Sequence, residues 1–178
     1  MIDRVAKFGR FLVRQSLQPT ETVTIGGGLG LYSSGWEPRA LEFTRCKHFE
    51  PSQALAFRFS EPADTAAEEL QHEQIAQFLT GKGIRFDDVA LSPVAAVESN
   101  SERLARLIQA LPTPDSPTVF IEASIIPRIY LQKIVYRLLG QNTVPRVVIG
   151  YAIGAYQDAV APAPAPLTEG QWLLDSVV

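Results

Sequence analysis

Short apolar segments alternate with segments of helical periodicity along the middle of this chain. Continuous apolar runs such as Val147-Val148-Ile149 are typical of strands buried on both faces of a parallel sheet. The alternation predicts βαβ units with right-handed crossovers. We therefore expect a Rossmann-like α/β fold, with an open, mainly parallel five-stranded sheet flanked by helices. The predicted strands cover residues 22–26, 54–59, 88–93, 118–123 and 146–151.

Helix signals occupy the segments between these strands. Two capping-box patterns, in which Glu follows Ser or Thr by three residues, begin such segments at Thr65 and Ser99. Prolines suited to a first helical turn begin two more such segments. Glycines end the helix that begins at Thr65 and the helix that begins at Pro127. Residues 27–36 are compatible with a loop or a hairpin. Two predicted helices cover residues 37–47 and 65–80. A third begins near Ser99, and a fourth runs from Pro127 to Gly140.

The two ends of the chain differ from this middle part. Residues 2–17 carry apolar side chains at helical spacing with basic residues between them, which predicts an N-terminal amphipathic helix. Alternating alanine and proline at 161–166 predict a spacer, and an apolar segment follows it. Because a free apolar tail is unfavourable in water, we expect it to pack on the domain or on a neighbouring subunit. The chain thus divides into a helix at 1–20, an α/β domain at 21–158, and a linker with an apolar tail at 159–178.

Composition and charge narrow the class of protein. The 178 residues suffice for one domain, and a net charge of −3 argues against a dedicated nucleic-acid binder, although it allows a local basic patch. A lone cysteine, Cys46, forms no disulfide within the chain, and with only two histidines it cannot build a structural zinc site. No apolar stretch approaches the roughly 20 residues that cross a bilayer. We therefore expect a cytoplasmic protein without a bound metal or cofactor.

A glycine cluster follows the first predicted strand. In an open parallel sheet, ligands bind beyond the carboxyl ends of the strands, near the point where strand order reverses. Glycines at 26–30 would let the backbone approach a phosphate there. Neither the dinucleotide fingerprint nor the P-loop is complete, because Trp36 and Glu37 stand where a P-loop has lysine and serine or threonine. The alternative is a flexible turn. Our candidate ligand contacts in this segment are Gly28, Gly30 and Ser34.

Polar residues also follow the other predicted strands. Arg39, near a predicted helix start, would bind phosphate or carboxylate, and Glu37 would contact a ribose hydroxyl. Glu122 ends an apolar strand, and because a buried unpaired carboxylate is costly, it should find a partner or face a cleft. The alternative is an internal ion pair of Glu122 with Arg39 or Arg128. The remaining candidates are Ser124 and Arg128 at the next helix start, and Tyr151, which would stack on a base.

The predicted arrangement resembles the CARF and SAVED group, the Rossmann-like sensor domains of prokaryotic defence systems. The resemblance covers roughly residues 22–156 and rests on the glycine-rich loop after the first strand and on the polar turn from Glu122 to Arg128. It implies that a nucleotide second messenger binds at the carboxyl edge of the sheet, within a role in antiviral defence. Ser124-Ile125-Ile126-Pro127 stands where CARF domains typically carry a Gly-Gly-Thr-Lys-like turn, so no catalytic residue is carried over.

Three functions fit these observations. The first is a binding module that recognises a nucleotide or another anionic small molecule at the carboxyl edge of the sheet. The second is a non-catalytic interaction subunit, which contacts a protein partner or a second copy through residues 1–18 and 167–178. The third is a hydrolase or transferase acting on a nucleotide-like substrate, with Glu122 or Glu37 as general base. Cys46 near His48 is a weaker candidate nucleophile, because neighbouring residues on a helix do not face one another.

Overall fold

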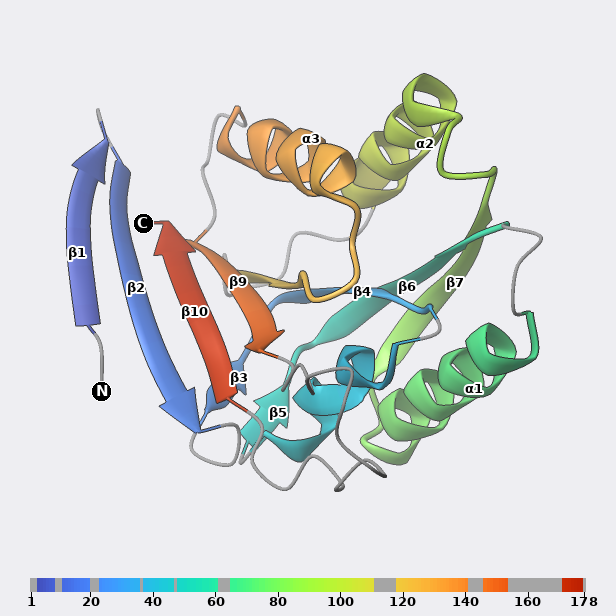
Figure 1. The fold of residues 1–178 in the computed structure, drawn as a ribbon, viewed down its shortest axis with the longest axis horizontal. Helices are drawn as coiled ribbons and strands as arrows, with labels where there is room; N and C mark the ends of the chain where they lie inside the picture. The colour runs from blue at the N-terminus through green and yellow to red at the C-terminus, as the bar shows by residue number, and fades with distance from the viewer. Residues whose placement is uncertain are drawn as a thin grey trace, which may run out of the picture.

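Five parallel strands form the centre of the computed structural model of this chain (Figure 1). The described residues are 3–8, 11–19, 23–35, 37–46, 48–60, 65–110, 118–140, 146–153 and 171–177. The parallel strands are β4 (Leu29–Ser33), β6 (Gln53–Phe59), β7 (Arg85–Leu91), β8 (Thr118–Glu122) and β9 (Arg146–Ile153). Read from the β7 edge, they lie in the order β7-β6-β4-β8-β9. When the five parallel strands are numbered along the chain, this is the Rossmann order 3-2-1-4-5. The predicted open α/β sheet is therefore confirmed.

Three antiparallel strands extend this sheet beyond β9. They are β10 (Gln171–Val177), β2 (Phe11–Pro19) and the edge strand β1 (Asp3–Phe8). Leu174, for example, pairs with Gly150 on one side and with Ser16 on the other. The described part of the tail, residues 171–177, thus pairs with strands of its own chain, as one of the two alternatives predicted. The spacer at 161–166 lies outside the described residues.

The predicted N-terminal helix over residues 2–17 is wrong, because the described part of that segment forms β1 and β2. Local periodicity is a weak signal for a short segment, and pairing with neighbouring strands overrides it. Here β10 pairs with the parallel strand β9 and presents its other side to β2. β2 pairs with β10 along the whole length of β10, and β1 pairs with β2. The backbone groups of β2, and those of β1 that face β2, therefore bond between strands and not within a helix.

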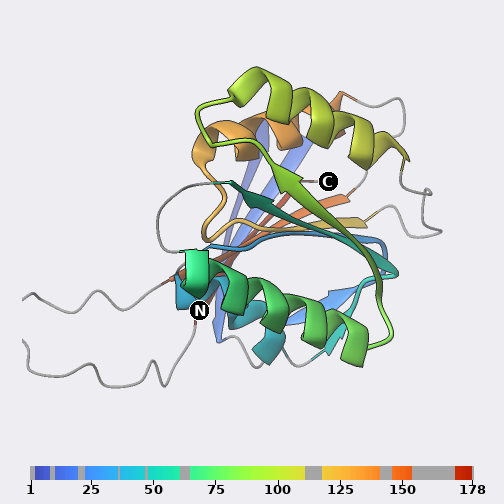
Figure 2. The same ribbon diagram turned by 90° about the vertical axis from the view of Figure 1, so that its right-hand side faces the viewer.

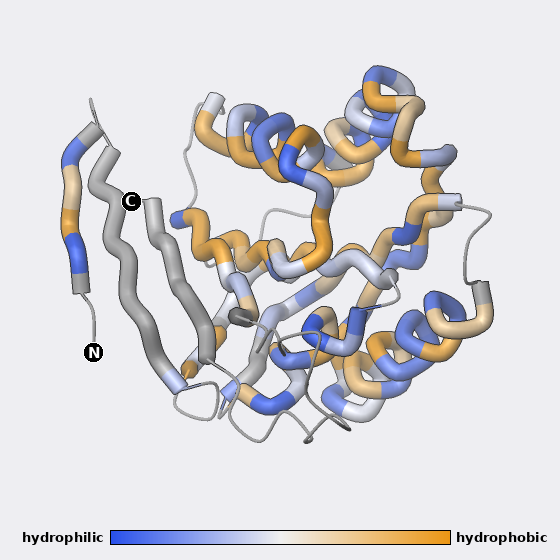
Figure 3. Tube along the Cα trace, in the orientation of Figure 1, coloured by the Kyte–Doolittle hydropathy of each residue, from blue (hydrophilic) through white to orange (hydrophobic). Residues whose placement is uncertain are grey.

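Helices cover both faces of the parallel strands (Figures 1 and 2). On one face lie α2 (Val97–Ala110) and α3 (Arg128–Leu139), and on the other lie α1 (Thr65–Gly81) and the 3₁₀ helix η2 (Pro38–Arg45). Hydrophobic and hydrophilic residues are interspersed along the helices (Figure 3), as expected when one face of a helix is buried. Two cores result, one on each face of the sheet, built around Leu31 and Tyr130 and around Tyr32 and Phe43.

The central strand of the sheet is β4, which lies in the segment 27–36 that the sequence left as a loop or hairpin. The strand predicted at 22–26 exists as β3 (Thr24–Gly26), but it pairs with β5 (His48–Glu50) in a separate two-stranded sheet. Gly27 and Gly28 have φ values of 34° and 92° and form the turn between β3 and β4. The glycine cluster therefore precedes β4 and lies at the amino edge, opposite to the predicted position.

The helices match their predicted positions with two differences. The segment at 37–47 forms the 3₁₀ helix η2 in place of an α-helix. The capping box at Ser99 is wrong, because α2 already begins at Val97 and the Ser99 hydroxyl donates to the Ala96 carbonyl at 3.2 Å. By contrast, α3 begins after Pro127 and ends at Gly140 as predicted.

Asn100 holds the turn that connects β7 to α2. Its side chain is 1% exposed, and its Nδ2 lies 3.0 Å from the Ser92 carbonyl oxygen and 3.0 Å from the Tyr130 hydroxyl. Its Oδ1 accepts a hydrogen bond from the Ser92 amide at 3.0 Å. We expect Asn100→Ala to lower the free energy of unfolding by about 2–3 kcal/mol, because several partners lose their bonds together. Urea denaturation measures this change. Ser99→Ala, at the exposed neighbouring position, should change the free energy of unfolding by less than about 0.5 kcal/mol. Equal effects of both variants would contradict the role of Asn100 in holding the turn.

Candidate functional site at the carboxyl edge of the sheet

The chain leaves the neighbouring strands β4 and β8 toward opposite faces of the sheet. After β4 it continues into η2, on the face that α1 covers, and after β8 it continues into α3 on the other face (Figure 2). This divergence is the topological switch point of a doubly wound sheet, where ligands bind beyond the carboxyl ends of the strands. The site therefore has to be sought among the residues that directly follow β4 and β8.

Glu122 is the last residue of β8 and is fully buried. The Ser124 backbone amide donates to its Oε1 at 2.9 Å, whereas Oε2 has no hydrogen-bond partner among the described residues. Burial raises the pKa of Glu122 to about 8, against the smaller lowering effects of Ser124 and of the Arg39 charge. Near neutral pH, Glu122 therefore carries a proton and is a buried hydrogen-bond donor without a negative charge.

Arg39 extends from η2 over the same edge. Its Nη1 donates to the Tyr151 hydroxyl at 2.9 Å, its Cζ lies 5.5 Å from the centre of the Tyr151 ring, and its Nε forms an ion pair with Glu37. Partial burial lowers the pKa of Arg39, but Glu37 and Tyr151 raise it above its usual value, so the guanidinium stays charged. No hydrogen bond joins the Nη2 donors to a described residue, and the Arg39 side chain is 16% exposed.

Five predicted candidates therefore meet around this edge. Arg39 contacts both Glu37 and Tyr151, and its charge acts on Glu122. Ser124 belongs to the same cluster, since its hydroxyl accepts a hydrogen bond from the Ala152 amide at 2.8 Å. That bond fixes the chain after β8 against β9. The cluster combines the Arg39–Glu37 ion pair with one neutral buried acid, and the donors of Arg39 and Glu122 suit a ligand that offers hydrogen-bond acceptors.

Other predicted candidates do not join this cluster. Arg128, in the first turn of α3, is exposed and forms no ion pair with a described residue, so the predicted Glu122–Arg128 pair is absent from the described part of the chain. Gly28 lies in the turn at the amino end of β4, where its amide donates to the Ser52 hydroxyl at 3.4 Å. Gly30 lies inside β4, and a Cβ there would come within 2.2 Å of the Tyr32 hydroxyl. Packing against Tyr32 therefore accounts for glycine at this position.

Ser34, the first residue after β4, contacts a residue that the sequence did not select. Its hydroxyl lies 3.1 Å from Nδ1 of His72, on α1, and both side chains are buried. Nε2 of His72 lies 2.9 Å from Oδ2 of Asp88, on β7. The three residues come from three separate elements, so only their spatial arrangement, and no sequence spacing, could have indicated the contact.

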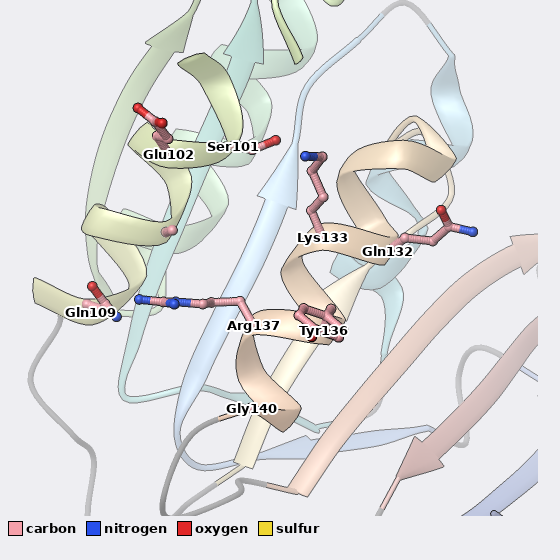
Figure 4. Close-up of a pocket in the computed structure, with 9 residues that line it drawn as sticks. Ser101, Glu102, Gln109, Gln132, Lys133, Tyr136, Arg137 and Gly140 are labelled. Carbon is pink, nitrogen blue, oxygen red and sulfur yellow. The ribbon is translucent and has the colours of Figure 1, made fainter. Parts of the chain in front are cut away.

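A groove between α2 and α3 forms a concave surface on the face of the sheet that these two helices cover (Figure 4). Its volume is about 910 Å³, and its lining includes Ser101, Gln109, Lys133, Tyr136 and Arg137. In Figure 4, Arg137 extends from α3 toward Gln109 on α2. Lys133 forms an ion pair with Glu98 at 3.1 Å, which leaves Arg137 as the cation of the lining without an ion pair to a described residue. No sequence motif indicates this groove, because its residues are ordinary polar or partly exposed helix positions.

Among the residues that the structure describes, no group of three or more His, Cys, Asp or Glu side chains is placed to hold a metal ion. None of the helices that the structure describes combines the length and apolar character that crossing a membrane requires.

No protein-family model matches the chain. No curated protein matches it in sequence. Among solved structures, it is similar to a conserved hypothetical protein of Streptococcus pyogenes, with a TM-score of 0.38 and 13% identity over 86% of this chain and 88% of that one.

Proposed function

We propose that this protein is a binding module for a nucleotide or another anionic small molecule, held at the carboxyl edge of the sheet. The observation that carries the proposal is the position of Arg39 near a neutral, buried Glu122 at the switch point between β4 and β8. Arg39 supplies an unused face of its guanidinium to a phosphate or carboxylate. Glu122, protonated near pH 7, donates a hydrogen bond and does not repel the ligand's charge.

The neighbouring groups suit a ligand with an aromatic part. Tyr151 lies half-buried beside Arg39, and its ring is already engaged by the guanidinium. Rings held in this way offer a preformed surface on which a base can stack. Glu37 keeps Arg39 in place and would accept a hydrogen bond from a ribose hydroxyl. A nucleotide therefore satisfies more of the groups at this edge than a simple inorganic anion does. We propose that this binding serves ligand sensing in antiviral defence, as the resemblance to CARF and SAVED domains implies.

Titration of the full chain with a panel of mononucleotides and cyclic and linear oligonucleotides, followed by calorimetry, tests the proposal. We expect at least one member to bind, and Arg39→Met to weaken that binding roughly 10- to 100-fold, because a charge-assisted contact is lost. Arg85→Met is the matched control, since Arg85 begins β7 at the opposite edge and is exposed. Absence of binding by every member of the panel to the folded protein would refute the proposal, as would equal weakening by both variants.

A further inference from the structure

A serine, a histidine and an aspartate lie next to one another across the face of the sheet that α1 covers. The Ser34 hydroxyl is 3.1 Å from His72 Nδ1, and His72 Nε2 is 2.9 Å from Asp88 Oδ2. Ser34 and His72 are 5% and 8% exposed, whereas the Asp88 side chain is 47% exposed. One end of this line is therefore enclosed and the other reaches water.

The proton positions follow from this arrangement. A neutral imidazole carries one proton, and the carboxylate beside Nε2 favours the tautomer with the proton on that nitrogen. Nδ1 is then free to accept the Ser34 hydroxyl proton. The Nε2–H bond does not point along a hydrogen-bond line to Asp88, so their attraction is electrostatic and strengthens when the ring becomes charged. These are the roles of nucleophile, base and orienting carboxylate in serine hydrolases, with the two ring nitrogens exchanged.

The position of Ser34 supports a chemical role. It directly follows the central strand, at the edge where open α/β sheets place their reactive groups. The Ser34 amide donates to the Phe57 carbonyl at 3.0 Å, which fixes the backbone from which the hydroxyl projects. A nucleophile held on a strand end by its own backbone is positioned more accurately than one on a free loop.

We propose that Ser34 is a nucleophile that accepts an acyl group from ester substrates, with His72 as its general base and Asp88 as a positioning residue. Ser34 Oγ bonds to the ester carbonyl carbon while its proton passes to His72 Nδ1, and the carbonyl π electrons move to the oxygen. When the tetrahedral intermediate collapses, the alkoxide leaves and takes the proton from the imidazolium. Water, activated by His72, then releases the acid and restores the serine. This activity is independent of anion binding at Arg39 and Glu122.

A fluorophosphonate probe tests this proposal with the full chain. In the labelling step, Ser34 Oγ bonds to phosphorus, fluoride leaves, and His72 takes the serine proton. Intact-mass and peptide mass spectrometry should show one adduct, located at Ser34. Ser34→Ala should abolish the adduct, whereas Ser33→Ala, on the buried neighbour, should label within about twofold of the wild-type rate. An unlabelled wild-type Ser34, or the same adduct in Ser34→Ala, would overturn the proposal.

The base is tested through the labelling rate. General-base assistance is typically worth about 100- to 10,000-fold, so His72→Gln should slow labelling by at least 100-fold. Because His72 is buried and its loss could affect folding, Asp88→Asn provides a second variant at a half-exposed position. It should slow labelling about 10-fold while the thermal unfolding temperature stays within 2 °C of wild type, and Asp88→Glu should restore part of the rate. Labelling at the wild-type rate in both His72→Gln and Asp88→Asn would show that the contact is only structural, and would overturn the proposal.

Discussion

The free energy of unfolding should fall as the pH rises from 5 to 8, and Glu122→Gln should remove most of that fall. Burial raises the pKa of Glu122 from 4.5 to about 8 in the folded protein. Below pH 4.5 the carboxyl is protonated in both the folded and the unfolded chain, so its contribution does not change with pH. Between pH 4.5 and pH 8 only the folded chain keeps the proton. Stability therefore decreases by about 1.4 kcal/mol per pH unit over this window.

The size of this effect makes it measurable by urea denaturation at a series of pH values. Between pH 5 and pH 8 the contribution of Glu122 amounts to about 4 kcal/mol, a large part of the stability of an ordinary domain. Glutamine has nearly the same shape and no charge, so Glu122→Gln should be more stable than the wild type at pH 8 and similar to it at pH 5. Glu98→Gln is the control, since Glu98 is 84% exposed and should leave the slope unchanged. Parallel pH curves for the wild type and Glu122→Gln would contradict a neutral, buried Glu122.

The same proton connects stability with the proposed function. An acid kept neutral in an apolar site costs stability as the pH rises, and such costs are typical of sites that serve a ligand. An alternative is that Glu122 is an ordinary member of an internal ion pair. Its partners argue against this, because Arg39 pairs with Glu37, and Oε2 of Glu122 has no hydrogen-bond partner among the described residues.

The sequence predicted the parts of the fold that depend on local signals. The apolar runs at β8 and β9, the helix α1 and the end of α3 at Gly140 are all determined by residues close in sequence. Glu122 could be identified for the same reason, because a carboxylate at the end of an apolar run is unusual wherever the strand lies. These features require no knowledge of the partners that each segment meets.

The missed features depend on contacts between distant segments. β1 and β2 are strands because β10 offers a sheet edge, and nothing in residues 2–17 reveals that edge. The contacts of Ser34 with His72 and of Arg39 with Tyr151 join residues 38 and 112 positions apart. The central strand β4 was missed because glycine at position 30 indicated a loop. Glycine is required there because the Tyr32 ring packs over this position.

Gly30→Ala should therefore be among the most destabilising single substitutions in the described part of the chain. The new Cβ would lie 2.2 Å from the Tyr32 hydroxyl oxygen and 2.5 Å from a ring carbon. The ring cannot move aside, because it is fully buried and its centre lies 4.5 Å from that of Phe43 and 6.0 Å from that of Phe120. Overpacking of this kind costs about 3 kcal/mol or more.

A double-mutant cycle separates this clash from the general effect of replacing a glycine. Gly30→Ala should cost about 3 kcal/mol beside Tyr32 but less than about 1 kcal/mol beside Tyr32→Leu, because leucine ends short of the added methyl group. Gly81→Ala is the matched control, since Gly81 ends α1 with nothing within 4 Å of a Cβ and should be neutral or slightly stabilised. Equal costs of Gly30→Ala in both backgrounds would mean that backbone flexibility, and not the Tyr32 ring, requires glycine in the central strand.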